Sequence, residues 1–352
     1  MINIVAIIPI RSSGFKGVIN KDVRMCNGKP LFVYSIEHAL KSKWINRVVV
    51  STDSEEYAEI ALTYGAEVPF LRPADISKDT SFDIEVFSHA LYYFADNEDY
   101  YPEICVHLRP TAPVRGYKII DEMIEILLNN PDIDSVRSVS PSKYTPYKMW
   151  LKDDKNILIP VAMCDVKDAY NAPRQILPIT YVQNSCVDVV RSRTIMNNNS
   201  MTGDRIAGYV QGMNFDIDTE ADFIRAEHYL EIKEKFINGE KLTVCFDIDG
   251  ILAEKTIQQD YSKAKPIQKT IEFLNELHQM GHTIILFTAR GTVTGTDWNE
   301  VTSKQLKKWN VSYSELKFGK PAADIYVDDK FVDIDSLAEY VFNDTEFNAK
   351  EK

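Results

Sequence analysis

The sequence lacks several features that mark large classes of protein. Its five cysteines are scattered and include no CxxC pair, so neither a zinc ribbon nor a disulfide framework is indicated. No apolar run approaches the roughly 18 residues of a membrane-spanning helix. The formal charge of −12 leaves no general basic surface for nucleic acid. We therefore expect no membrane or nucleic-acid partner, and reduced thiols fit a cytoplasmic location.

The composition and length indicate a globular protein with two domains. The 352 residues exceed a typical single domain, and 45% hydrophobic with 26% charged residues is ordinary for a folded chain. The apolar run at residues 4–10 is too short for a spanning helix, and its arginine follows it rather than precedes it. We interpret this run as a buried strand and not as a signal sequence.

Short apolar runs alternate with longer helical patterns. Strands are expected at IVAIIPI, RVVVST and EICVHLR, and helices at PLFVYSIEHALKS, SEEYAEIALTYG and YKIIDEMIEILLNN. This alternation predicts an α/β fold with a mostly parallel, Rossmann-like sheet, in which ligands bind at the carboxyl ends of the strands. A helical segment at residues 219–239 ends in Asn-Gly, and the pattern then restarts. We therefore predict domains at residues 1–238 and 239–352.

The loop RSSGFKGVINKD follows the first expected strand and combines glycines with three cations. Glycine lets the backbone approach a phosphate closely, while Arg11, Lys16 and Lys21 can neutralise several negative charges. Near the end of the first domain, Asp216 and Asp218 stand two residues apart. Carboxylates at this spacing on a strand end point to one face and suit Mg²⁺, which prefers oxygen ligands.

The segments NGKPLFVYSIEHAL, VVVSTDSEE, AEVPFLRPADISKDTSFD and HLRPTAPVR occur in this order over about residues 3–230. Together they resemble the cytidylyltransferases that activate sialic acids and related nonulosonic acids as CMP-sugars. The resemblance implies that CTP and a sugar acid are the substrates, that Lys21 is catalytic, and that Asp216 and Asp218 hold Mg²⁺. It implies nucleotide contacts from Arg11, Lys16, Asp22, Arg72, Ser81 and Arg109.

Three features depart from the family pattern. The first loop is one residue longer, Asp22 replaces an asparagine, and Arg109 replaces a glutamine near the nucleotide. An extra cation at position 109 would favour an acceptor with more negative charge. Within YNAPRQILPITYVQNSCVDVVR, which resembles the family's acceptor region, the expected acceptor contacts are Arg174, Gln175 and Asn184.

Each of these residues also has a simpler structural interpretation. Arg174 would be a surface ion pair, Asp216 a helix cap and Ser81 a turn residue. The order in which the motifs occur favours the functional interpretation of the set.

The stretch VCFDIDGILAE begins a second candidate site, because a strand there ends in DxDG. FTAR with Thr288, FGKP with Lys320, and YVDD with Asp328 and Asp329 follow in order. This set resembles the haloacid dehalogenase superfamily of phosphatases, here uncapped because the motifs are closely spaced. The resemblance implies that Asp247 forms an aspartyl-phosphate, Asp249 is the acid and base, and Thr288 and Lys320 hold phosphate. Mg²⁺ would be held by Asp247, Asp249, Asp328 and Asp329.

The sequence therefore predicts a bifunctional enzyme: a CTP-dependent cytidylyltransferase fused to a Mg²⁺-dependent phosphatase that acts on a related sugar phosphate. Two alternatives stay open. The acceptor would be a phosphorylated or phosphonate compound, or one domain would be a degenerate binding module. The resemblance also implies a homodimer or higher homo-oligomer, in which a second chain would add acceptor contacts.

Overall fold

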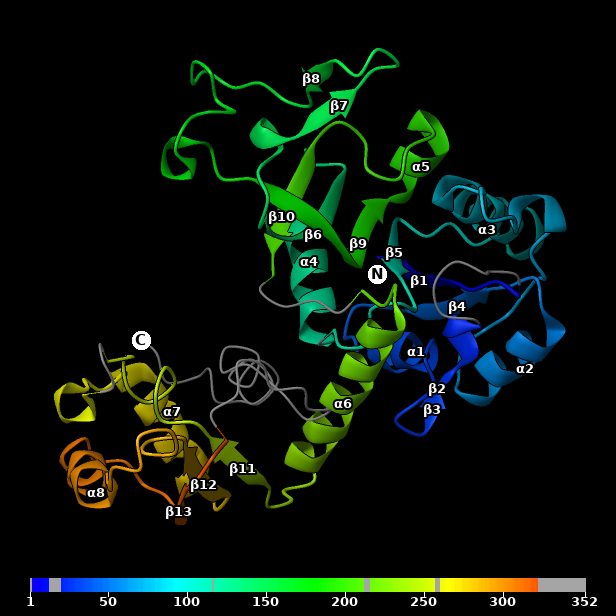
Figure 1. The fold of residues 1–352 in the computed structure, drawn as a ribbon. Coiled ribbons are helices and arrows are strands. Elements are labelled where there is room, and N and C mark those ends of the chain that lie inside the picture. The colour runs from blue at the N-terminus through cyan, green and yellow to red at the C-terminus, as the bar shows by residue number, and fades with distance from the viewer. Residues whose placement is uncertain (1, 13–19, 116, 212–215, 257–259, 322–352) are drawn as a thin grey trace. The chain divides into compact units, whose positions relative to one another are not determined.

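The computed structural model describes residues 2–12, 20–115, 117–211, 216–256 and 260–321 (Figure 1). Contacts divide the chain into two compact units, Met1–Glu227 and His228–Lys352. The division falls inside helix α6 (Glu220–Ile237), shortly before the predicted boundary at 238/239. Each unit has a hydrophobic core of its own.

The first unit contains a six-stranded sheet in the order β10-β6-β9-β5-β1-β4. β9 runs antiparallel to both neighbours, and every other pair is parallel, which confirms the predicted mostly parallel α/β fold. The strands are β1 (Ile4–Pro9), β4 (Arg47–Ser51), β5 (Ile104–Leu108), β6 (Ser135–Pro141), β9 (Tyr181–Arg191) and β10 (Ile206–Val210).

Helices cover both faces of this sheet, which is why β1 is a continuous apolar run. Ile4, Ala6 and Ile8 pack on one face with α1, α2 and α4, while Val5 and Ile7 pack on the other with α3 and α5. The helices are α1 (Val33–Leu40), α2 (Glu55–Thr63), α3 (Asp83–Glu98), α4 (Tyr117–Asn129) and α5 (Ser192–Asn198). None of the helices in the described ranges is long and apolar enough to cross a membrane.

Two small hairpins complete the first unit. One pairs β2 (Met25–Cys26) with β3 (Lys29–Pro30), shortly after Lys21. The other pairs β7 (Trp150–Lys152) with β8 (Leu158–Pro160), which lie apart from the six-stranded sheet in Figure 1.

The second unit contains a three-stranded parallel sheet in the order β11-β12-β13. Its strands are β11 (Thr243–Phe246), β12 (Thr283–Thr288) and β13 (Glu315–Phe318), and its helices are α7 (Gln268–Gln279) and α8 (Asn299–Lys308). The sequence predicted β11 and β12 but not β13, which has only four residues. The predicted strand ADIYVDD lies outside the described residues.

Candidate functional site

A cavity of about 450 Å³ lies at the carboxyl ends of β1 and β5. This is where a parallel α/β sheet places its ligands, because loops from neighbouring strands meet there. Seven residues predicted from the sequence line the cavity: Arg11, Lys21, Asp22, Arg72, Ser81, Arg109 and Asp218. Lys16 lies outside the described residues. The structure thus brings together side chains as far apart in the chain as Arg11 and Asp218.

The Lys21 side chain reaches the second predicted aspartate. Its Nζ donates to the Ile217 carbonyl and lies 3.6 Å from Asp218 Oδ1. Ile217 N–H in turn donates to the Thr111 carbonyl at 2.9 Å, which ties this segment to the loop after β5. Asp218 therefore lies at the cavity beside Lys21 with 77% of its side chain exposed.

A capping box at the start of α6 follows directly after Asp216 and Asp218. Thr219 N–H donates to Asp222 Oδ2 at 2.8 Å, and Asp222 N–H donates to Thr219 Oγ1 at 3.2 Å. Asp222, rather than Asp216, is thus the carboxylate that caps α6. Asp216 is half-buried and Asp218 is exposed.

These two carboxylates fit the predicted Mg²⁺. The ion commonly takes one or two protein carboxylates together with substrate phosphates, and of these two aspartates Asp218 lines the cavity. Among the described residues, no group of three or more His, Cys, Asp or Glu side chains is placed to hold a metal by itself. A metal at this site would therefore depend on the phosphates of the nucleotide.

Arg72 is a buried cation in the cavity wall. Its Nη2 donates to the Ile10 carbonyl at 2.8 Å, its Nη1 to the Ser51 carbonyl at 3.2 Å, and its Nε to Ser77 Oγ at 3.0 Å. The guanidinium thereby joins the ends of β1 and β4. Burial lowers its pKa, yet a guanidinium stays charged. Arg72 thus supports the loop and contributes positive charge to the cavity.

The remaining loop residues are held by local contacts. Arg11 donates to the Lys78 carbonyl at 2.8 Å and pairs with Asp79 at 3.0 Å. Ser12 N–H donates to Asp53 Oδ1 at 2.8 Å. Ser81 Oγ accepts from Lys78 N–H at 3.1 Å, which is the turn role considered above, although Ser81 also lines the cavity.

Burial raises the pKa of Asp22 to about 6, although Lys21 and Arg11 act to lower it. A carboxyl whose folded pKa is raised contributes stability below its unfolded pKa, and loses that contribution as pH rises through the folded value. We expect the wild type to lose stability between about pH 4 and pH 6 relative to Asp22→Asn. Urea unfolding of both proteins at about pH 4.5 and pH 7.5 measures this. A stability difference that is the same at both pH values would contradict it.

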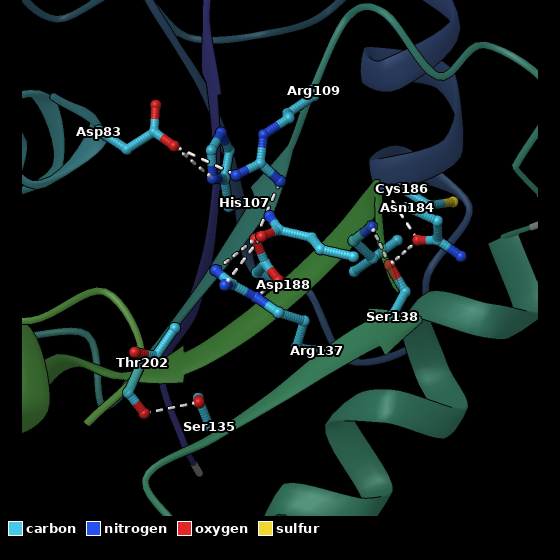
Figure 2. Close-up of polar contacts among 12 residues, drawn as sticks. Asp83, His107, Arg109, Ser135, Arg137, Ser138, Asn184, Cys186, Asp188 and Thr202 are labelled. Carbon is cyan, nitrogen blue, oxygen red and sulfur yellow. Dashed lines mark hydrogen bonds and ion pairs between the residues drawn. The ribbon is translucent and has the colours of Figure 1, made fainter. Parts of the chain in front are cut away.

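Arg109 belongs to a charged network that spans three strands (Figure 2). Its Nη1 donates to Asp188 Oδ2 on β9 at 2.9 Å, and its Nη2 to Asp83 Oδ2 at 3.1 Å. Arg137 on β6 donates to the other Asp188 oxygen at 2.7 Å. Burial acts to raise the pKa of Asp188, but the two arginines hold it below the ordinary value. Position 109 is thus not an unbalanced cation, because two carboxylates contact it.

The three predicted acceptor contacts do not line the cavity. Arg174 is exposed and donates to the Ser142 carbonyl at 2.8 Å, and Gln175 is exposed beside it. Asn184 is buried, where it accepts from Ser138 Oγ at 2.6 Å (Figure 2). Their role in binding the acceptor stays a prediction.

In the second unit, the predicted residues meet at the carboxyl ends of β11 and β12. Lys320 Nζ lies 2.9 Å from Asp247 Oδ2, although 73 positions separate them in the sequence. Lys320 N–H donates to the Thr288 carbonyl at 3.1 Å, and this bond joins the segment after β13 to the end of β12. Thr288 is fully buried, and its hydroxyl accepts from the Arg290 N–H at 3.2 Å. Asp328 and Asp329 lie outside the described residues.

Asp249 is held by an arginine to which the sequence assigned no role. Arg290 Nη2 and Nε donate to the two Asp249 oxygens at 2.7 and 2.8 Å, and the Arg290 side chain is fully buried. Gln305 Oε1 accepts a further bond from it at 2.9 Å. The signal was available, because Arg290 is the last residue of the FTAR motif.

In the first unit, the sequence assigned no role to four residues of the network around Arg109, namely Asp83, His107, Arg137 and Asp188. The available signal was a charged residue within an apolar strand pattern, as in CVDVV and ICVHL, because a buried charge needs a partner. The sequence does not show which partner that is.

The fold and the cavity define a nucleotide-binding α/β protein with lysine and paired aspartates at the ligand edge of its sheet. The chain belongs to the cytidylyltransferase family, whose model matches residues 5–288.

Named relatives share about a third of their residues with it. It is 31% identical over 227 residues to post-translational flagellin modification protein B of Campylobacter coli, which covers 63% of this chain and 92% of that protein. It is 31% identical over 238 residues to the CMP-N,N'-diacetyllegionaminic acid synthase of Legionella pneumophila, which covers 66% and 98%. A solved structure of CMP:2-keto-3-deoxy-manno-octonic acid synthetase complexed with CTP has a TM-score of 0.50 at 12% identity and covers 66% of this chain and 99% of that one. The last likeness concerns the fold alone.

Proposed function

We propose that the first unit transfers CMP from CTP to a nonulosonic, sialic-acid-like sugar. The observation that carries the proposal is Lys21, whose ammonium lies beside Asp218 in a cavity lined by three arginines. A triphosphate requires this concentration of positive charge, and a metal would join it at Asp216 and Asp218. The relatives named as CMP-sugar synthases support the sugar acid as acceptor.

In the proposed reaction, a hydroxyl oxygen of the sugar acid attacks the α-phosphorus of CTP. The bond from the α-phosphorus to the bridging oxygen breaks, pyrophosphate leaves, and the hydroxyl proton passes to solvent. Lys21 and Arg11 neutralise the charge that spreads over the phosphate oxygens, and Arg72 keeps the loop in place behind them. Mg²⁺, when bound, would supply further charge neutralisation.

The test is pyrophosphate release from CTP and Mg²⁺ with a panel of acceptors. N-acylneuraminic, N,N'-diacetyllegionaminic and pseudaminic acids represent the sugar acids, and their phosphate or phosphonate analogues represent the alternative. Release with at least one free sugar acid supports the proposal. Release with a phosphorylated acceptor alone would replace it, and CTP binding without any turnover would favour a binding module.

For the second unit, we propose Mg²⁺-dependent hydrolysis of a sugar phosphate. The Lys320 ammonium at 2.9 Å from Asp247 carries this proposal, because such a cation offsets the repulsion between a carboxylate nucleophile and a phosphate dianion. Asp247 would attack phosphorus while Asp249 protonates the leaving sugar oxygen, so that the sugar alcohol is released; Asp249 would then take a proton from the water that cleaves the aspartyl-phosphate and frees inorganic phosphate. If the two reactions are consecutive, the phosphatase supplies the free sugar acid that the first unit activates.

We also propose that the chain forms a homodimer through the surface around the β7–β8 hairpin. Exposed apolar side chains gather between residues 144 and 182, a density unusual for a free surface. Examples are Tyr144, Leu151, Ile157, Ile159, Met163 and Ile179. A second copy is the occupant that the family resemblance implies.

Leu151 and Ile159 are cross-strand partners on this hairpin, with 62% and 49% exposure. We expect Leu151→Glu with Ile159→Glu to convert a dimer into a monomer, because charges replace buried apolar contacts. Analytical ultracentrifugation measures this. Leu62→Glu, at 56% exposure on α2, is the control that should leave the dimer intact. A wild-type monomer, or a dimer that survives the double substitution, would contradict the proposal.

A further inference from the structure

The charges of the network around Asp188 balance only when the carboxylate of Asp83 is included. Arg109 and Arg137 both bind Asp188, whose side chain is 4% exposed, so two cations share one buried carboxylate. His107 adds no charge, since burial lowers its pKa well below the ordinary value and Arg109 acts in the same direction. The buried part of the network therefore carries a net charge of about +1, and a second anion is needed to balance it.

In the structure this second anion is Asp83. It is the first residue of α3, its Oδ2 accepts from Arg109 Nη2 at 3.1 Å, and its side chain is 46% exposed (Figure 2). Both Asp83 and Arg109 line the cavity, whereas Asp188 does not. The two carboxylates on Arg109 thus differ: one is fixed in the interior, and the other stands at the cavity surface, where water can solvate it once released.

We propose that the carboxylate of the acceptor displaces Asp83 and binds Arg109, so that Asp83 acts as an internal competitor of the acceptor. This inference rests on the proposed function, which supplies a sugar acid as the substrate. It assigns Arg109 to the acceptor rather than to the nucleotide.

Chemistry favours the acceptor carboxylate over a CTP phosphate as the displacing anion. One carboxylate exchanged for another keeps the charge of the network and the planar geometry that an arginine edge accepts. A triphosphate would bring several negative charges near Asp188. Lys21 and Asp218, which lie beside the Ile217–Thr111 link, are instead the candidate contacts for the phosphates and their metal.

The first experiment is Asp83→Asn, which removes the competing charge and keeps the size of the side chain. With an active sugar acid at saturating CTP, we expect the KM for the acceptor to fall about three- to tenfold, while the KM for CTP stays unchanged. Asp96→Asn, an exposed position on the same helix, is the matched control and should leave both constants unchanged.

The second experiment is Arg109→Gln, which restores the residue of the family pattern. We expect the KM for the acceptor to rise about ten- to hundredfold, and Asp83→Asn to give no gain in that background, because the two residues act through one contact. The methyl ester of the sugar acid, used as a competitive inhibitor, should bind all four proteins equally. Thermal unfolding of each variant shows whether the buried pair with Asp188 has been disturbed.

The outcomes separate the inference from the function on which it rests. If the wild type releases no pyrophosphate with any sugar acid, the proposed function fails. If the wild type is active but Asp83→Asn raises the KM for the acceptor or leaves it unchanged, the inference fails. A change confined to the KM for CTP would assign Arg109 to the nucleotide and would also overturn it.

Discussion

Replacing Lys21 by methionine is expected to lower kcat for cytidylyl transfer about a thousandfold. Methionine keeps much of the volume of the lysine side chain but removes the ammonium that lies 3.6 Å from Asp218. That charge is needed most when negative charge spreads over the transferred phosphoryl group, so kcat should fall more than the affinity for CTP. Pyrophosphate release under saturating CTP and acceptor gives kcat, and equilibrium dialysis gives the affinity.

Lys21→Arg is the matched control. It keeps the charge but changes the geometry, since a guanidinium is larger and planar, and it should retain part of the rate. Lys29→Met removes an ammonium that instead pairs with Glu37 at 2.6 Å, and it should leave kcat unchanged. A Lys21→Met protein with a raised KM for CTP and a normal kcat would assign Lys21 to binding alone.

The sequence predicted most of the first unit's fold because its central strands are buried on both faces. β1 and β5 are continuous apolar runs, and helices with clear periodicity follow them. The strands that the sequence did not predict lack a continuous run of buried apolar residues. β6 alternates irregularly, β10 has no fully buried residue, and β7 and β8 have three residues each and are mostly exposed. Their strand conformation depends on pairing partners that the local sequence does not reveal.

In the cavity, too, the local sequence does not reveal which residues contact one another. Motif order placed Lys21 and Asp218 in one site, and the loops of a parallel sheet made their meeting predictable. Their contact, however, also requires the bond from Ile217 to Thr111, which joins segments about a hundred positions apart. Arg109 was expected to be an extra cation because its partner Asp188 lies 79 positions away and has no motif of its own.

In the second unit, Asp247→Asn is expected to lower phosphatase turnover about a thousandfold or more, with cytidylyl transfer unchanged. An amide does not form the acyl-phosphate, so the first chemical step is lost. The loss of charge also leaves Lys320 Nζ, now 2.9 Å from a carboxylate oxygen, opposite a neutral group. Phosphate binding should therefore persist or tighten while turnover stops. Release of inorganic phosphate from sugar phosphates in the presence of Mg²⁺ measures this, and isothermal titration with inorganic phosphate measures binding.

Asp297→Asn is the control, because Asp297 is an exposed carboxylate of the same unit that accepts from Asn299 N–H at 2.8 Å. It should leave phosphate release at the wild-type rate. Full phosphatase activity in Asp247→Asn would mean that another group attacks phosphorus. A wild type that binds phosphate but releases none from any sugar phosphate would instead identify the unit as a binding module. Because each unit has its own core, Lys21→Met should leave phosphate release unchanged just as Asp247→Asn leaves cytidylyl transfer unchanged. This reciprocal result is what two separate active sites in one chain require.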